Sequence, residues 1–314
     1  MRERLFLWHA FFKKIRFFFE ERGYLEVQTP KIVPYAAMEA NIESITTFPM
    51  GLAEPFFLIT SPEFAMKALL AQGSGPIFQI TPAFREKEVG RWHHYEFQML
   101  EWYKPAVDHH QLMEEVQDFL FLFLPNFKVE KITYQQAFRQ HLGLDPFQFD
   151  LATWRTALAD LWEENFCQNL LKNGLDVFLD YVFGFALQPK LGQEKLCFLS
   201  DFPISQAPFS KKNPDGKTAA RFEVFYQGVE LANGSYELNN SQEQKQRFFD
   251  LNLLRKKEGK KELKMDEEFL KNLNSLPNCS GVALGLDRLL ALHQQEKNQA
   301  GLDSVLLFQR EEKK

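Results

Sequence analysis

FREKEVGRWHHYEFQMLEWY, residues 84–103, brings many charged and aromatic side chains together, and it decides how the chain folds. It joins two segments with the composition of strands, PIFQITPAF (76–84) and HHYEFQMLEWYKP (93–105). The polar segment REKEVGRW (85–92) contains Gly90 and connects them. We therefore predict two antiparallel strands that face each other across a charged turn.

The beginning of the chain predicts a long helix followed by a strand. Between residues 5 and 19, apolar side chains recur at spacings of three and four, which places them on one helical face. Gly23 favours the end of this helix. Residues 24–29, YLEVQT, then predict a short strand that stops before Pro30.

Later segments alternate between helix and strand character. FFLITSPEF (56–64) leads into a helix, for which we predict Ser61 as the N-cap and Pro62 as the first residue. Residues 107–124 and most of 133–190 have helical periodicity. No repeat and no clear linker interrupts the chain, so we expect one large domain.

The composition is that of a folded protein and limits its function. Of the 314 residues, 45% are hydrophobic and 25% are charged, and the formal net charge is −5. This charge argues against a protein whose main task is to hold nucleic acid. Three widely spaced cysteines predict neither a disulfide framework nor a zinc site. Because no apolar run suits a signal peptide or a membrane span, we expect a soluble, cytoplasmic protein.

Two arginines are suited to a ligand with negative charge. Arg85 lies in the charged turn, and a guanidinium can hold phosphate or carboxylate with two parallel hydrogen bonds. Arg288 follows Gly281 and Gly285 in CSGVALGLDRLLALH (279–293), a predicted strand that turns into a helix. The small residues allow a close approach to a ligand, although close packing explains them equally well.

Two carboxylates in ARFEVFYQGVELANGSYEL (220–238) are candidate metal ligands. Glu230 and Glu237 are seven positions apart, so a bulge or turn at Asn233-Gly234 is needed to bring them to one side. Together they would suit Mg²⁺. A hairpin with an exposed Asn-Gly turn remains the alternative.

Two polar segments have less specific interpretations. The loop SKKNPDGKTA (210–219) is a candidate lid, because it is polar and contains both Gly and Pro. The basic run RKKEGKKELK (255–264) could bind phosphate, but a solvated helix face is the favoured interpretation.

Taken jointly, the segments resemble the three signature motifs of class II aminoacyl-tRNA synthetases. The first helix and strand with Pro30 look like motif 1, residues 84–103 look like motif 2, and GVALGLDRLLAL (281–292) looks like motif 3. The resemblance implies an α+β fold, in which an antiparallel sheet flanked by helices forms one catalytic domain over residues 1–314. Motif 1 implies a homodimer.

The detail is most similar to the lysyl branch of that class, in TSPE (60–63), in MLEWY (99–103) and in residues 220–238. Because motif 1 begins at about residue 4, we expect no N-terminal OB-fold that reads the anticodon. The chain therefore resembles the elongation factor P β-lysine ligases, which lack that domain. Ala283 occupies a position where lysyl-tRNA synthetases have glycine, and the resemblance links alanine there to a preference for (R)-β-lysine over α-lysine.

The resemblance also implies a role for each site residue. Arg85 and Arg288 would be catalytic, holding the α- and γ-phosphates of ATP. The ATP-binding set would be Arg85, Glu86, His93, His94, Phe97, Glu230, Glu237 and Arg288. The amino-acid-binding set would be Ser61, Glu63, Glu101, Tyr103, Asn233, Glu237 and Ala283. Glu230 and Glu237 would hold Mg²⁺.

The function implied is a two-step ligase reaction, in which (R)-β-lysine is activated as an adenylate and transferred to a lysine of elongation factor P. No stable tRNA binding is expected. Lys87 departs from the family, which usually has glutamate there, and Glu86 or Glu88 could replace it. His94 and Tyr95 also depart, from the Asn and Pro of the ligases. The alternatives are an α-lysine-activating enzyme that acts on tRNA or another acceptor, and a non-catalytic regulatory paralogue.

Overall fold

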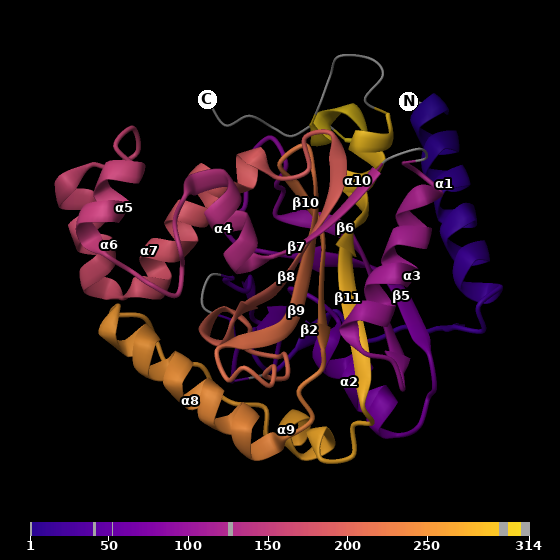
Figure 1. The fold of residues 1–314 in the computed structure, drawn as a ribbon. Helices are drawn as coiled ribbons and strands as arrows, with labels where there is room; N and C mark the ends of the chain where they lie inside the picture. The colour runs from indigo at the N-terminus through magenta and orange to yellow at the C-terminus, as the bar shows by residue number, and fades with distance from the viewer. Residues whose placement is uncertain (1, 40–41, 52, 125–127, 295–300, 309–314) are drawn as a thin grey trace. The chain divides into compact units, whose positions relative to one another are not determined.

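The structure is a computed structural model, and it describes residues 2–39, 42–51, 53–124, 128–294 and 301–308 (Figure 1). The chain forms two compact units, Met1–Pro125 with Glu237–Lys314 and Asn126–Tyr236. Among the described residues, no helix has the length and apolar character that crossing a membrane requires. The prediction of one domain over residues 1–314 stays a prediction.

Four neighbouring strands form the larger sheet among the described residues of the first unit. In spatial order they are β1 (Leu25–Glu26), β5 (Ile77–Phe84), β6 (Glu96–Pro105) and β11 (Cys279–Gly285). β1 runs parallel to β5, whereas β5 with β6 and β6 with β11 are antiparallel. The predicted strand pair is thus confirmed, with Phe84 opposite Glu96. β6 begins three residues later than predicted, because Gly90 and His93 instead pair with each other across the turn.

Helix α1 (Arg2–Glu20) confirms the predicted N-terminal helix. Its buried side chains are Trp8, Phe11, Ile15, Phe18 and Phe19. Phe19 stacks on Phe78 of β5 with ring centroids 4.6 Å apart, so this face covers the sheet. Gly23 ends the turn after the helix with φ +73°, a value that favours glycine. The strand that follows is shorter than predicted and comprises only Leu25–Glu26.

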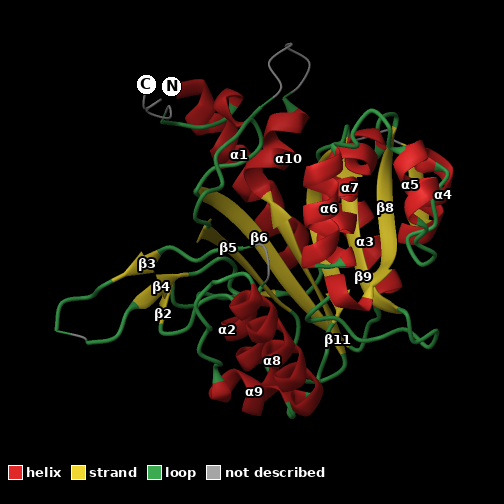
Figure 2. Ribbon diagram, turned by 90° about the vertical axis from the view of Figure 1, so that its left-hand side faces the viewer, coloured by secondary structure: helices red, strands yellow, loops and turns green. Residues whose placement is uncertain are grey.

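The other helices of the first unit are α2 (Glu63–Ala71), α3 (His109–Phe121), α8 (Ser241–Lys257), α9 (Glu267–Leu273), α10 (Leu286–His293) and the 3₁₀ turn Leu302–Ser304. Figure 2 shows α2, α8 and α9 grouped together, and Phe64 of α2 stacks on Phe269 of α9 at 3.8 Å. A small antiparallel sheet lies beside them in the order β2 (Ile32–Val33), β4 (Phe56–Leu58), β3 (Thr46–Thr47).

The predicted start of α2 is wrong by one residue. Helix α2 begins at Glu63, and Pro62 rather than Ser61 occupies the N-cap position. The hydroxyl of Ser61 nevertheless accepts a hydrogen bond from the backbone N–H of Glu63 at 3.3 Å. Ser61 therefore supports the first turn without being its cap.

The described residues of the second unit form four strands and several helices. Its strands, in spatial order, are β10 (Val229–Tyr236), β9 (Thr218–Tyr226), β8 (Lys195–Pro203) and β7 (Lys128–Thr133). Its helices are α4 (Tyr134–Leu142), α5 (Leu151–Ala157), α6 (Glu164–Asn173), α7 (Leu175–Val182), a π-helical turn (Phe183–Leu187) and 3₁₀ turns at Gln188–Lys190 and Ile204–Gln206. Trp154 and Phe178 are buried in its aromatic core.

The expected Asn-Gly turn is absent from the second unit. Asn233 and Gly234 lie inside β10 and pair with Glu223 and Phe222 of β9. The break in register falls between Glu230 and Ala232 instead. The alternative of an exposed hairpin turn at Asn-Gly is therefore wrong, and the irregularity is a bulge earlier in the strand.

Candidate active site

Three carboxylates from separate segments meet around a buried lysine in the first unit. Glu63 and Lys67 lie one turn apart on α2, and the Lys67 Nζ is 2.5 Å from Oε1 of Glu63. The same Nζ is 2.6 Å from Oε2 of Glu237. Only 2% of the Lys67 side chain is exposed. Burial alone would lower the pKa of Lys67, but the two carboxylates hold it above its usual value.

Glu101 is the third carboxylate, and it has a different kind of partner. The hydroxyl of Tyr103 donates a hydrogen bond of 2.5 Å to Oε1 of Glu101. Oε2 is buried and has no hydrogen-bond partner among the described residues. Burial, together with the charge of Glu63, raises the pKa of Glu101 to about 8. A buried carboxylate oxygen without a donor suits a cationic ligand.

Strand β11 supplies the small residues beside these groups. Gly281 lies opposite Tyr103, and Ala283 lies opposite Glu101 in the antiparallel register. A Cβ atom on Gly281 would lie 2.7 Å from Oε1 of Glu237 and even closer to the ring of Tyr103. Glycine is therefore required at position 281 because strand β11 packs closely against Tyr103 and Glu237. Close packing and proximity to the candidate site, the two interpretations of the small residues, are thus compatible.

Arg85 lies in the charged turn after β5. Its guanidinium carbon is 5.1 Å from the centroid of the Phe97 ring, and one nitrogen is 3.7 Å from Oε1 of Glu88. Nε of Arg85 is buried and has no hydrogen-bond partner in the part of the chain that the structure describes. A buried donor on a permanent cation suits an anionic ligand.

Arg288 comes from the first turn of α10 and contacts the same turn. Its Nε donates a hydrogen bond of 3.0 Å to the carbonyl oxygen of Trp92. The neighbouring residue Asp287 accepts a hydrogen bond of 2.6 Å from the backbone N–H of Gln98 on β6. Burial raises the pKa of Asp287 to about 6. These contacts hold the start of α10 against β6 and the charged turn.

The remaining predicted residues of the charged turn are less buried. Glu86 is exposed, while its backbone N–H donates to the carbonyl of Glu43 at 2.9 Å. His93 is exposed, and Nδ1 of His94 lies 2.8 Å from the carbonyl oxygen of Glu96. Lys87 has φ +65°, so its backbone lies in the left-handed region, and the residue is exposed. Of the two acidic residues beside it, Glu88 is the one that faces Arg85.

Two predicted residues belong to the second unit. Glu230 is half-buried at the bulge of β10. The Oδ1 atom of Asn233 accepts a hydrogen bond of 3.3 Å from Arg221, which also pairs with Glu223. Glu63, Glu101, Tyr103, Glu237 and Ala283 lie in the first unit with the arginines. The roles of all these residues, including Glu230 and Asn233, stay predictions.

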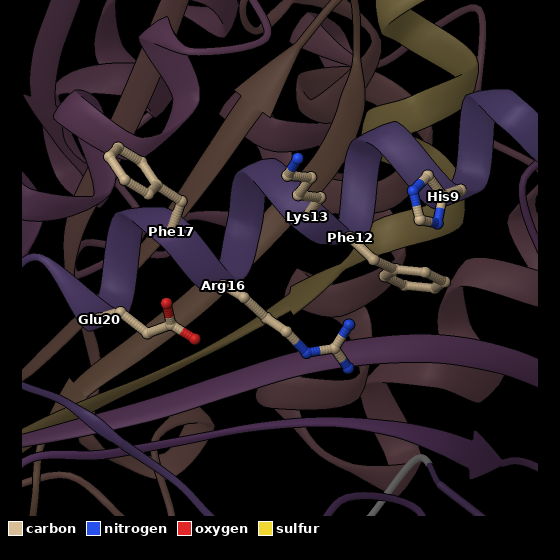
Figure 3. Close-up of a pocket in the computed structure, with 6 residues that line it drawn as sticks. All are labelled: His9, Phe12, Lys13, Arg16, Phe17 and Glu20. Atoms are coloured by element: carbon tan, nitrogen blue, oxygen red, sulfur yellow. The ribbon is translucent and has the colours of Figure 1, made fainter.

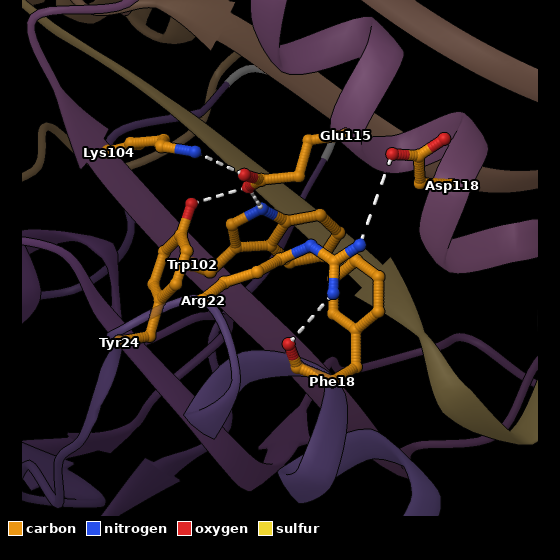
Figure 4. A network of polar contacts seen from close by, with 7 residues as sticks. All are labelled: Phe18, Arg22, Tyr24, Trp102, Lys104, Glu115 and Asp118. Carbon is orange, nitrogen blue, oxygen red and sulfur yellow. Dashed lines mark hydrogen bonds and ion pairs between the residues drawn. The ribbon is translucent and has the colours of Figure 1, made fainter.

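A second polar network supports β6 from its other face. Figure 4 shows the Glu115 carboxylate of α3 with donors from three side chains. Trp102 donates from Nε1 at 3.1 Å, Lys104 lies at 2.5 Å, and the hydroxyl of Tyr24 also donates. Trp102 and Lys104 alternate with Glu101 and Tyr103 along the strand, so this network fixes the strand that carries Glu101.

The sequence interpretation missed two buried polar residues of this region. Lys67 follows Glu63 by four positions, a spacing that predicts an ion pair on one helix face and could have revealed it. Gln79 is a polar residue within the apolar strand β5, and it is fully buried opposite Glu101. Nothing in the local pattern distinguishes it from a residue on a solvated face.

Comparison with known proteins agrees with this architecture. The family model "tRNA synthetases class II (D, K and N)" matches residues 1–311. A protein named elongation factor P–(R)-β-lysine ligase, from Hamiltonella defensa subsp. Acyrthosiphon pisum (strain 5AT), is 41% identical over 302 residues, which are 94% of this chain and 91% of the relative. A protein of the same name from Salmonella arizonae is 41% identical over 294 residues, 90% of this chain and 88% of the relative. The chain therefore belongs to the class II tRNA synthetase family, and within it to the group of the elongation factor P–(R)-β-lysine ligases.

Proposed function

We propose that this protein activates (R)-β-lysine with ATP and transfers it to a lysine of elongation factor P. Two relatives with that name match about nine-tenths of the chain at 41% identity. Enzymes of the class II family use ATP. The proposal includes a cytoplasmic location, because the acceptor is a translation factor. It does not include stable binding of tRNA.

The observation that carries the proposal is a pair of buried unpaired groups of opposite character. Nε of Arg85 is a donor without an acceptor, and Oε2 of Glu101 is an acceptor without a donor, among the described residues. Such groups are rare in folded proteins unless a ligand satisfies them. An anionic phosphate suits the arginine, and the ammonium of a diamino acid suits the glutamate.

The reaction follows from these charges. A carboxylate oxygen of the amino acid attacks the α-phosphorus of ATP, the bond to the β-phosphate breaks, and pyrophosphate leaves. Arg85 and Arg288 would stabilise the negative charge on the phosphates during this step. In the second step the neutral amine of an acceptor lysine attacks the activated carbonyl. AMP leaves, the amine loses a proton, and an amide forms.

Magnesium is the expected counter-ion of the triphosphate, and carboxylates are the ligands that it prefers. The described residues contain no group of three or more His, Cys, Asp or Glu arranged for a metal ion. Oε2 of Glu237 contacts Lys67, so a metal ion at this oxygen requires that Lys67 gives up the contact. Glu230 is the other predicted ligand, and it is half-buried at the bulge of β10.

A homodimer through α1 is a further part of the proposal. A hollow of about 370 Å³ lies along this helix. Figure 3 shows the six side chains that line it, His9, Phe12, Lys13, Arg16, Phe17 and Glu20. Phe6 and Phe17 are each 61% exposed on the same helix. Exposed aromatic side chains next to a hollow suit contact with a second copy. The proposed dimer is tested by comparing the sedimentation of a variant in which Ser replaces Phe6 and Phe17 with that of the protein without substitutions.

The decisive experiment is ATP–pyrophosphate exchange with purified protein, comparing (R)-β-lysine, α-lysine and other amino acids. We expect (R)-β-lysine to give the fastest exchange. Incubation with elongation factor P, ATP and (R)-β-lysine should then add the mass of one β-lysyl group to elongation factor P, and lysine-charged tRNA should not accumulate. Preference for α-lysine with tRNA charging would refute the proposal in favour of a synthetase, and no exchange with any amino acid would favour a regulatory paralogue.

A further inference from the structure

A buried amide without partners lies next to Glu101. Gln79 of β5 is 0% exposed. Neither its amide oxygen Oε1 nor its nitrogen Nε2 has a hydrogen-bond partner in the described ranges. A buried amide that makes no hydrogen bond costs free energy, so its presence requires an explanation.

The register of the sheet places Gln79 within reach of the site. Gln79 lies opposite Glu101 in the antiparallel pair of β5 and β6, and Glu101 lies opposite Ala283 in the pair of β6 and β11. Residues that lie opposite each other in antiparallel strands point to the same face, with Cβ atoms about 5 Å apart. The three side chains therefore form one row across the sheet, with Gln79 at its buried end and the half-buried Ala283 at the other.

The unused atoms of this row match one chemical group. Oε1 of Gln79 and Oε2 of Glu101 are both acceptors without donors among the residues that the structure describes. An ammonium has three N–H donors and no acceptor, so it can donate to both oxygens at once. Lys67 does not fill this place, because its ammonium contacts Glu63 and Glu237.

We propose that Gln79 is a substrate-binding residue that accepts a hydrogen bond from the distal ammonium of the diamino acid, beside Glu101. This rests on the proposed function, because it assumes that a diamino acid is the substrate. The Gln79 amide can turn its oxygen to the substrate ammonium and its nitrogen to the Glu101 carboxylate, so that substrate binding satisfies both ends of the amide. The glutamate supplies the charge, and the amide adds a second acceptor that rejects a methyl group in the same place.

The test replaces Gln79 by methionine, which has a similar length but no hydrogen-bonding amide. We expect the KM for (R)-β-lysine in pyrophosphate exchange to rise about 10- to 100-fold, the effect of losing a hydrogen bond to a charged group. The KM for ATP should not change. Without substrate, the melting temperature of Gln79→Met should equal or exceed that of the unmodified protein, because an unsatisfied amide has been removed.

A matched control lies on the same strand and face. Thr81 is 1% exposed, and its hydroxyl donates to the backbone carbonyl of Pro82 at 3.2 Å. Thr81→Val also removes a buried polar group from β5, so an unchanged KM for (R)-β-lysine is expected. A substrate analogue with a methyl group in place of the distal ammonium provides a second measurement. Inhibition by this analogue should be equally weak or stronger in Gln79→Met, whereas (R)-β-lysine binding should weaken.

The outcomes separate this inference from the function on which it rests. A KM for (R)-β-lysine within about twofold of the original in Gln79→Met overturns the inference and leaves the function intact. Equal weakening of (R)-β-lysine and of the methyl analogue, together with a lower melting temperature, also overturns it, since that pattern indicates a structural role. If the unmodified protein activates no diamino acid, the proposed function itself fails.

Discussion

Replacing Lys67 by methionine should destabilise the protein strongly and in a pH-dependent way. The Nζ atom contacts carboxylates at 2.5 and 2.6 Å, and 2% of the side chain is exposed. Removing one partner of a buried ion pair costs about 3–5 kcal/mol, because the remaining charge loses its counter-ion. For about 200 residues that unfold together, 3 kcal/mol lowers the melting temperature by about 6 to 12 °C.

The size of the effect should depend on protonation of Glu237. Burial already raises the pKa of Glu237 to about 7, and without Lys67 it rises further. The carboxyl can then take up a proton as the pH falls, which removes the uncompensated charge. The destabilisation by Lys67→Met should therefore be larger at about pH 8 than at about pH 6.

Thermal melting followed by circular dichroism at these two pH values measures the effect. The double variant Lys67→Met with Glu237→Gln is the matched control, because it removes both buried charges of the contact and should recover part of the lost stability. A single variant that melts within about 2 °C of the unmodified protein at about pH 8 would refute the buried ion pair as a stabilising contact. Equal losses at the two pH values would refute the assigned role of Glu237.

Three further results are expected. Arg288→Ala should abolish pyrophosphate exchange while the melting temperature stays within about 2 °C, because the side chain is only half-buried; near-normal exchange would contradict its role. Ala283→Gly should shift the exchange ratio from (R)-β-lysine toward α-lysine, and an unchanged ratio would exclude Ala283 from substrate selection. The KM for (R)-β-lysine should fall as the pH rises through about 8, because Glu101 must ionise to hold an ammonium. Glu101→Gln should have a high KM that varies less with pH, and a parallel pH profile would assign the titration to another group.

The same pKa has a consequence for stability without substrate. Glu101 titrates near 4.5 when unfolded and at about 8 when folded, so folding favours the protonated carboxyl. This contribution is fully present below about pH 4.5 and is lost as the pH rises through about 8. A bound ammonium would lower the folded pKa, so substrate should stabilise the protein more at high pH than at low pH.

The sequence predicted those parts of the fold whose signals are local. The strand pair around residues 84–103 and the helix that precedes Gly23 follow from periodicity and turn composition, and the structure confirms both. The start of α2 was missed by one residue, because Pro62 adopts the N-cap position itself with ψ near 6°. Helix boundaries commonly shift by this amount.

The errors and omissions have a common physical cause. Asn233 and Gly234 have the composition of a turn, but pairing with β9 extends them as strand, so tertiary contacts override the local preference. The burial of Gln79 and of Lys67 was not predicted, because it depends on strands and helices that are distant in the chain. Only the pairing of Lys67 with Glu63 had a local signal, their spacing of four residues. Candidate residues such as Arg85 and Glu101 were found through their motif, and their predicted contacts with substrate stay predictions.

Glu115 limits how segments of this protein can be exchanged with those of a relative. Its carboxylate accepts from Tyr24 after α1 and from Trp102 on β6, and it pairs with Lys104. Two stretches of chain that are separated in sequence therefore share one acceptor on a third. A chimaera that imports one of them without its matching acceptor would bury an unpaired group behind β6. Residues 24, 102–104 and 115 should accordingly be exchanged together when the proposed substrate site on the other face of β6 is altered.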